Sequence, residues 1–200
     1  MSNEVNNAWE VLHQETVFNH AFMSVAMETV RLPDGTIIED WPKVYTRDYV
    51  NALVFNEAGE ALILEGYKHG NGQSNWQMVG GYLEEGEDPV TAVKRELLEE
   101  TGHSCEKWFY LGSYVVDANR HVGIGHFFCA QGAQPITEIN HGDLEEMTLK
   151  WVSFKELKYA LLDGRISVIS YAITVALSML LVEQIIGPQK GSPPASDAIQ

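Results

Sequence analysis

A short stretch that ends in a run of glutamates constrains this chain more than any other of its 200 residues. Asp88 followed by Pro89 is typical of a helix start, because an Asp side chain caps free N–H groups and proline fits the first helical position. Gly102 is typical of a helix end. The pattern therefore predicts a helix over residues 89–101.

This helix is expected to have an apolar face and an acidic face. Apolar residues spaced by three and four positions, from Val90 to Leu97, form a stripe that can pack on a sheet. Like charges at helical spacing destabilise a helix by roughly 0.2–0.5 kcal/mol per pair, so helix stability does not select an acidic face. A solvated surface is one interpretation of that face, and a cation site is the other. The three carboxylates on it are Glu96, Glu99 and Glu100.

The neighbouring residues favour the cation site. From Gly81 to Gly102 the chain fits the pattern G-x5-E-x7-R-E-U-x-E-E-x-G, where U is apolar, and every specified position is filled. The stretch resembles the Nudix box. One position departs from the family, since His103 stands where an apolar residue usually follows the last glycine.

Each box residue has a chemical task. Glu87 and Arg95 are expected to form a charge-assisted pair that ties the loop to the helix. Gly81 is expected to let the backbone turn sharply, so that a main-chain carbonyl faces the helix. Glutamate oxygens suit hard cations such as Mg2+ or Mn2+. The predicted metal ligands are Gly80, Glu96, Glu99 and Glu100.

The charge balance supports a dependence on cations. The chain has 13 Lys and Arg against 28 Asp and Glu, a formal net charge of -15. Such a protein repels nucleic acids and anionic membranes, so neither is expected as a partner. It would also repel a diphosphate unless bound cations inverted the local charge.

The resemblance implies an α+β fold, the Nudix fold. This is an α/β/α sandwich of mixed sheet with the box helix and a long C-terminal helix, here preceded by antiparallel strands. Residues 70–75, rich in glycine, are expected to form a connector. The other expected strands are 20–32, 51–55, 61–64, 108–117, 122–130 and 148–152, and the other expected helices are 154–162 and 166–186.

Three segments follow from this pattern. Residues 1–48 are expected to form a strand region with a possible dimer contact, residues 49–186 the Nudix domain, and residues 187–200 a disordered tail. Residues 166–182 carry no charge and nearly reach bilayer-spanning length, but a buried or intersubunit helix is the favoured interpretation. No secretory signal is visible, so a cytoplasmic location is expected.

Over residues 40–160 the chain resembles the ADP-ribose pyrophosphatase branch of the family. That resemblance implies a homodimer that uses Mg2+ or Mn2+ to cleave the pyrophosphate of a nucleoside diphosphate derivative, such as ADP-ribose or a nucleotide sugar. Two features depart from the branch: Ala118 replaces a common proline, and Gly66-Tyr67-Lys68 replaces Gln-Tyr-Arg. The substrate within this class therefore stays open.

The branch often takes its general base from a loop beyond the box. Glu145 and Glu146 match that place, with Glu146 preferred because it precedes the apolar Met147, and Glu99 is the alternative base. Scarce cations and aromatic rings are candidates for holding substrate, although surface charge or core packing explains each equally well. They are Arg47, Lys68, Arg120, Trp41, Tyr67 and Trp76.

Two other functions remain possible on the same fold. One is a nucleoside triphosphate pyrophosphohydrolase, and the other is a catalytically silent nucleotide sensor. An isopentenyl diphosphate isomerase would need a reactive cysteine before the box, whereas Cys105 and Cys129 both follow it.

Overall fold

The computed structural model describes residues 8–138 and 147–186. It divides the chain into two compact units. The first takes residues 1–48 and 114–124, and the second takes residues 49–113 and 125–200. The predicted boundaries of the three segments stay predictions, and residues 187–200 lie outside the described residues.

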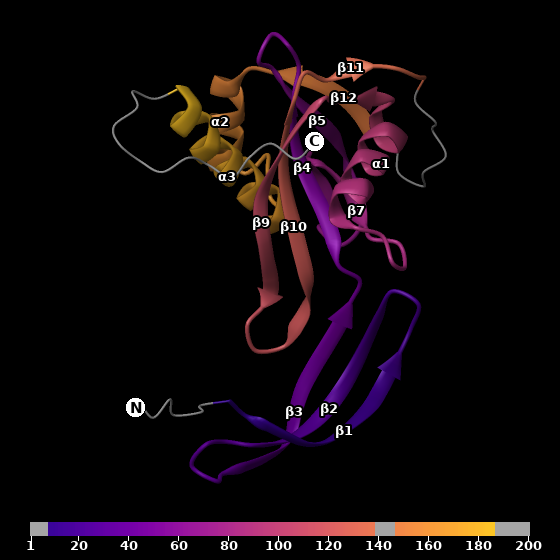
Figure 1. Ribbon diagram of the computed structural model, residues 1–200, viewed down its shortest axis with the longest axis vertical. Helices are drawn as coiled ribbons and strands as arrows, with labels where there is room; N and C mark the ends of the chain where they lie inside the picture. Colours follow the sequence, from indigo (N-terminus) through magenta and orange to yellow (C-terminus); the bar gives the residue numbers. More distant parts are fainter. Residues whose placement is uncertain (1–7, 139–146, 187–200) are drawn as a thin grey trace. The chain divides into compact units, whose positions relative to one another are not determined.

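The first unit contains three antiparallel strands, β1 (Glu10–Asn19), β2 (Met23–Arg31) and β3 (Ile37–Thr46) (Figure 1). Residues 121–122 of the same unit pair in parallel with β3. A turn over residues 33–35 joins β2 and β3. The Leu32 N–H donates to the Thr36 carbonyl at 2.8 Å, and the Thr36 N–H donates to the Asp34 carboxylate at 2.9 Å. The hydrogen bond from the Thr36 N–H is the main cause that lowers the pKa of Asp34.

The second unit is built on a mixed sheet. Its central strands β4 (Tyr49–Phe55) and β5 (Ala61–Lys68) pair only at Phe55 and Ala61. Beyond that point β6 (Gln73–Gln77) pairs with β5, and β7 (Val79–Tyr82) pairs with β4. The remaining strands are β8 (His103–Ser104), β9 (Lys107–Asp117), β10 (His121–Gln131), β11 (Gln134–Pro135) and β12 (Met147–Val152).

The outer strands complete the mixed pattern of the sheet. β10 runs parallel to β4 from Gly125 onward, whereas β12 runs antiparallel to β5. The short strands β8 and β11 form a separate antiparallel pair. Expected strands thus appear close to their predicted positions.

The expected connector over residues 70–75 is wrong in its second half. Residues 73–75 belong to β6, where Ser74 pairs with Tyr67 and Asn75 pairs with Gly66. The free edge of β5 pairs with these residues, and this long-range pairing outweighs their weak local strand preference.

Three helices cover the sheet of the second unit. They are α1 (Pro89–Thr101), α2 (Phe154–Asp163) and α3 (Ile169–Ile186). The predicted bounds of α1 are confirmed: Asp88 accepts hydrogen bonds from the Val90 and Thr91 N–H groups at 3.1 Å, and Gly102 has the left-handed φ of 68°. α3 begins three residues later than expected, because Ile166 is buried in the connection before it.

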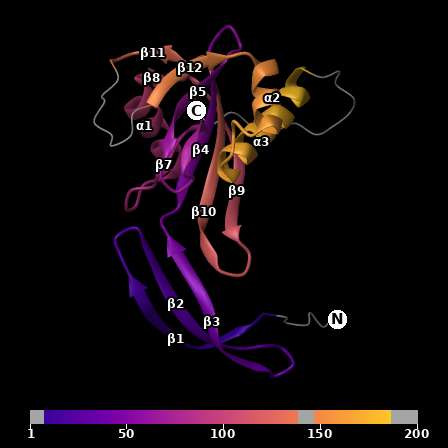
Figure 2. The ribbon, with the colours of Figure 1, turned by 180° about the vertical axis from the view of Figure 1, so that it is seen from behind.

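The helices lie on opposite faces of this sheet, as Figures 1 and 2 show. Ala92, Val93 and Leu97 of α1 pack with one set of sheet residues, which includes Val50 and Leu64. On the other face, residues of α2 and α3 pack with Leu53 and Ile63. The predicted α/β/α sandwich is therefore confirmed.

Among the described residues, no helix combines the length and the apolar character needed to cross a bilayer.

The buried stripe of α1 should be essential for docking this helix. Leu97 is 1% exposed, whereas its neighbour Leu98 is 38% exposed. The L97A variant is expected to lose about 2–5 kcal/mol in the free energy of unfolding, measured in urea, because it leaves a cavity. The matched L98A variant is expected to lose about 0.5 kcal/mol or less, and equal losses in the two variants would contradict this packing.

Candidate active site

Strand β7 lies directly against the glutamates of α1. The Gly80 N–H donates to the Glu100 carboxylate at 3.0 Å. A Cβ atom at Gly81 would lie 2.2 Å from Glu96 Oε1, closer than real side-chain contacts. The missing side chain of Gly81 therefore lets the strand backbone approach Glu96, whereas a Cβ at Gly80 would meet Val50 and Asn51 of β4.

The predicted role of Gly81 is wrong in one respect. Gly81 does not make a sharp turn, since it lies inside β7, pairs with Val50 and does not have a left-handed φ. Its missing side chain instead makes room for the Glu96 carboxylate. Gly80 contacts α1 through its N–H, which donates to Glu100. The role of its carbonyl as a metal ligand stays a prediction.

Arg95 connects the box loop to the acidic face. Its guanidinium donates to both oxygens of Glu87, at 3.0 and 2.9 Å, which confirms the predicted pair. The same guanidinium donates to Glu96 at 2.8 Å and to Glu99 at 3.0 Å. It also donates to the Tyr82 carbonyl at 3.2 Å. One cation thus holds three carboxylates and the end of β7.

The pKa shifts follow from these contacts. The hydrogen bond from Arg95 is the main cause that lowers the pKa of Glu87, and the Glu84 N–H adds to it. Glu96 has a side chain only 13% exposed, and burial raises its pKa despite the bond from Arg95. A buried carboxylate of this kind gains from an additional nearby cation.

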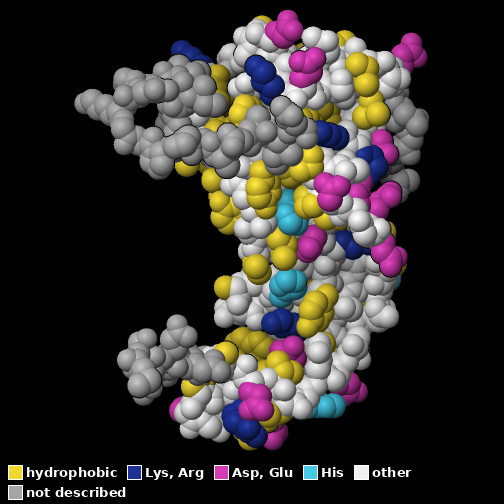
Figure 3. All heavy atoms as spheres, viewed as in Figure 1, with side chains coloured by type: hydrophobic (Ala, Val, Ile, Leu, Met, Phe, Trp, Pro, Cys, Tyr) yellow, Lys and Arg dark blue, Asp and Glu magenta, His cyan; other side chains and the backbone are white. Residues whose placement is uncertain are grey.

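The acidic face has the donor chemistry of a divalent cation site. Glu96 and Glu99 bring oxygens close enough to share one nitrogen of Arg95, and Glu100 is fixed beside them by Gly80. Hard carboxylate oxygens of this kind suit Mg2+ or Mn2+. Acidic side chains gather on the edge of the molecule that α1 occupies (Figure 3).

The described residues do not themselves form a ready cluster. No group of three or more His, Cys, Asp or Glu side chains among them is placed to hold a metal ion. In this arrangement the Arg95 guanidinium takes the position between Glu96 and Glu99. A cation that binds both carboxylates has to compete with this guanidinium.

The substrate candidates fall in both units. In the second unit, Tyr67 and Lys68 lie on β5, where Tyr67 is 49% exposed. The other three belong to the first unit: Trp41, Arg47 and Arg120.

Contacts in the first unit occupy two of its candidates. Trp41 donates through Nε1 to the Asn119 carbonyl at 3.1 Å, and its ring meets the Trp9 ring at 5.0 Å between centroids. Arg120 pairs with Asp117 at 3.6 Å, and Arg47 is exposed. Their roles as substrate ligands stay predictions.

Three other candidates need separate mention. Trp76 is a core residue, 6% exposed, with the Arg165 guanidinium 4.4 Å from its ring centroid, which supports the core-packing interpretation. Glu145 and Glu146 lie outside the described residues, so their role as general base stays a prediction.

Two buried amides on β6 were missed by the sequence analysis. Gln77 lies opposite Leu64, a core residue under α1, so Gln77 and Asn75 face the same side as α1. Gln77 donates to the Gly66 carbonyl at 3.1 Å. Asn75 is 3% exposed, and neither polar atom of its amide has a partner in the described structure. The alternation of polar and apolar residues from Asn75 to Met78 was the signal for this strand.

Comparison with known proteins identifies the class. An α/β/α sandwich that presents this box defines a hydrolase of phosphoric anhydrides. The NUDIX domain model matches residues 45–171, which is more than half of the chain, so the chain belongs to the Nudix family. The model of the nucleoside diphosphate sugar hydrolase N-terminal domain matches residues 9–43.

Three individual proteins resemble this chain in sequence or in fold. A methanol dehydrogenase activator of Bacillus methanolicus is 27% identical over 146 residues, covering 70% of this chain and 78% of its own. A CMP-5'-(N-acetyl-N-hydroxy-3-aminopropyl)phosphonate hydrolase of Streptomyces rubellomurinus is 26% identical over 162 residues, covering 78% and 75%. The crystal structure of an ADP compounds hydrolase matches the fold with a TM-score of 0.75 at 16% identity, covering 89% of this chain and 96% of that one.

The close approach at Gly81 should matter for activity more than for stability. A methyl group in G81A forces the flexible Glu96 carboxylate to move. The kcat for phosphoric anhydride hydrolysis is therefore expected to fall at least tenfold, while the midpoint of urea unfolding changes little. The control is G70A, because a Cβ at Gly70 meets no atom within 4 Å. Full activity in G81A would contradict the packing of Glu96 against β7.

The Glu87 pair should give a characteristic pH dependence. A carboxylate with a lowered pKa stabilises the fold above its unfolded pKa and loses that effect as the pH falls through the folded value. The difference in unfolding free energy between the protein and E87Q is therefore expected to be largest near neutral pH and to shrink below about pH 4. Urea titrations over this range measure it, with E85Q as the exposed control. A difference that does not vary with pH would argue against the pair.

Proposed function

We propose that this protein is a hydrolase dependent on Mg2+ or Mn2+ that cleaves the pyrophosphate linkage of a nucleoside diphosphate joined to another moiety, such as ADP-ribose or a related nucleotide sugar. The observation that carries this proposal is the complete box, in which Arg95 holds Glu87, Glu96 and Glu99. The match of residues 9–43 to the nucleoside diphosphate sugar hydrolase N-terminal domain supports the substrate class.

The cation would be held by Glu96, Glu99, Glu100 and the Gly80 carbonyl. When bound, it neutralises charge on the diphosphate and makes water easier to deprotonate. The chain's own groups act on these ligands: the Gly80 N–H fixes the Glu100 carboxylate, and Arg95 holds Glu96 and Glu99 at the position that the cation would take.

Hydrolysis also needs a general base. As a water oxygen bonds to phosphorus and the anhydride P–O bond breaks, the base takes the water proton at a carboxylate oxygen. Glu99 has a side chain 58% exposed, which leaves it the most accessible of the carboxylates paired with Arg95. Glu145 and Glu146 are the alternative bases.

The substrate within the class is a narrower proposal. The names of two relatives, the ADP compounds hydrolase and the CMP phosphonate hydrolase, support a nucleoside phosphate linked to a second group. Ala118 and Lys68 depart from the ADP-ribose pattern, so related nucleotide sugars belong in the same panel.

We also propose a homodimer that works in the cytoplasm. Apolar side chains about half exposed or more stand on the first unit, and these support contact with a second copy. They include Val11, Val17, Phe18, Phe22 and Ile37.

The glutamates of the box provide the direct test. E99Q and E100Q are expected to lower turnover of ADP-ribose by about two orders of magnitude or more, with unchanged urea midpoints, because each loses a charged oxygen ligand. The assay follows phosphate release through a coupled phosphatase, with and without Mg2+, over ADP-ribose, nucleotide sugars and nucleoside triphosphates. E85Q, in the exposed loop before α1, is the matched control. Undiminished activity in both variants would refute this site, and preference for triphosphates would favour the alternative hydrolase.

A further inference from the structure

Asn51 is the one polar residue in a buried run of strand β4. Residues 50–55 of this strand are all buried, and Asn51 itself is 4% exposed. Its Oδ1 atom has no hydrogen-bond partner among the described residues. A buried amide oxygen without a partner costs stability, so packing alone favours an apolar residue at this position. An amide that breaks the apolar pattern in this way is expected to serve the function instead.

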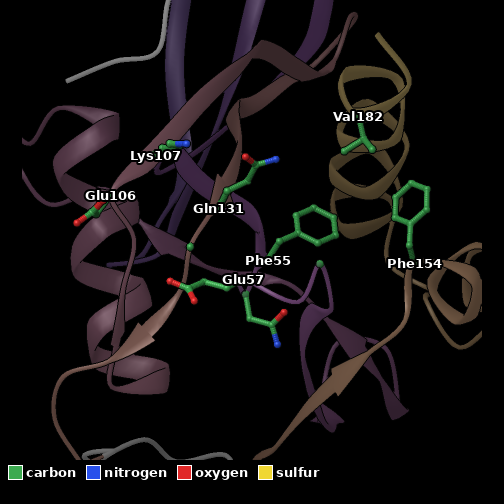
Figure 4. A pocket seen from close by; sticks show the side chains of 10 residues that line it. Phe55, Glu57, Glu106, Lys107, Gln131, Phe154 and Val182 are labelled. Atoms are coloured by element: carbon green, nitrogen blue, oxygen red, sulfur yellow. The ribbon is translucent and has the colours of Figure 1, made fainter. Parts of the chain in front are cut away.

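The cavity at the far end of β4 does not explain this amide. Phe55 is one of the walls of that cavity, which has a volume of about 890 Å3 (Figure 4). Asn51 is not among its lining residues. The Asn51 side chain lies against β7 instead, where Asn51 is paired with Gly80.

The Asn51 amide fills the space that a side chain at position 80 would need. A Cβ atom at Gly80 would collide with Asn51 Nδ2 and with the Val50 carbonyl oxygen. The same Nδ2 donates to the Val79 carbonyl at 3.5 Å, a long hydrogen bond in a buried site. Asn51 therefore contacts the peptide group that joins Val79 to Gly80.

That peptide group also contacts the acidic face of α1. Its carbonyl belongs to Val79 and accepts from Asn51, whereas its N–H belongs to Gly80 and donates to the Glu100 carboxylate at 3.0 Å. A peptide group is planar, so one rigid unit connects an amide of β4 to a glutamate of α1. Hydrogen bonds at both ends of such a unit polarise it and strengthen each other.

Asn51 acts on this peptide from behind the site. Leu53, two residues further along β4, packs with residues of α2 and α3, so Asn51 points to the same face of the sheet. Glu96 and Glu100 lie on the other face, with α1. The Asn51 side chain is therefore placed to hold β7 and not to hold the cation.

We propose that Asn51 is a positioning residue for the metal site, which acts on the Glu100 carboxylate through the peptide between Val79 and Gly80. This inference rests on the proposed function, in which Glu100 and the Gly80 carbonyl hold the cation. With Asn51 in place, the peptide is fixed from the side of β4 and its N–H stays directed at Glu100. Without that donor the peptide can tilt, and both assigned ligands lose their fixed positions.

The test uses N51V on the full chain, because valine is apolar, suits a strand and cannot donate a hydrogen bond. Mn2+ binding is measured by electron paramagnetic resonance with a nonhydrolysed nucleotide diphosphate analogue present, and N51V is expected to weaken it about tenfold. The midpoint of urea unfolding should stay the same or rise, because the unpartnered amide oxygen is gone. The matched control is L53V, on the same face of the same strand, which should lower the urea midpoint and leave Mn2+ binding unchanged.

Hydrogen exchange of the Gly80 amide, followed by NMR, tests the same contact without any metal. In the cation-free protein, N51V is expected to raise the exchange rate of this amide by roughly fivefold or more, while the exchange rate of the Leu53 amide stays the same.

Two results would overturn the proposal. One is Mn2+ binding that N51V leaves unchanged or that L53V weakens equally, and the other is an unchanged exchange rate at Gly80. Absence of Mn2+ binding by the unmodified protein would instead refute the metal site of the proposed function, so the two failures are distinguishable.

Discussion

The Arg95 guanidinium lies among the carboxylates of Glu87, Glu96 and Glu99. It connects α1 to the preceding loop and, through the Tyr82 carbonyl, to the end of β7. The acidic face of α1 would repel itself without a cation, and Arg95 offsets that repulsion while tying the preceding loop to the helix. The same contacts orient two of the carboxylates that we assign to metal binding. Structure and function therefore share one charged network at this position.

The sandwich places this network at the edge of the sheet. Leu97 and its buried neighbours hold one side of α1 on the sheet, so the glutamates are presented beside β7. The glycine at position 81 makes room for the Glu96 carboxylate, and the Gly80 N–H donates to Glu100. The apolar face of α1 thus packs on the sheet, while its acidic face carries the glutamates that we assign to metal binding.

Local signals were enough to predict α1 and the Glu87–Arg95 pair. Asp88, Pro89 and Gly102 mark the ends of the helix, and Arg95 lies close to Glu87 in the sequence. Long-range pairing was harder to predict. β6 forms because the edge of β5 is free, and Gly81 serves close packing rather than a turn, since only the folded sheet brings Glu96 beside it.

Manganese uptake measures whether the glutamates of the box hold a divalent cation. Electron paramagnetic resonance of free Mn2+, titrated with the protein in the presence of a nonhydrolysed nucleotide diphosphate analogue, counts the ions that the protein binds. We predict clear Mn2+ binding that is strongly weakened when Glu96 is replaced by Gln. Absence of Mn2+ binding by the unmodified protein, with the analogue present, would contradict it.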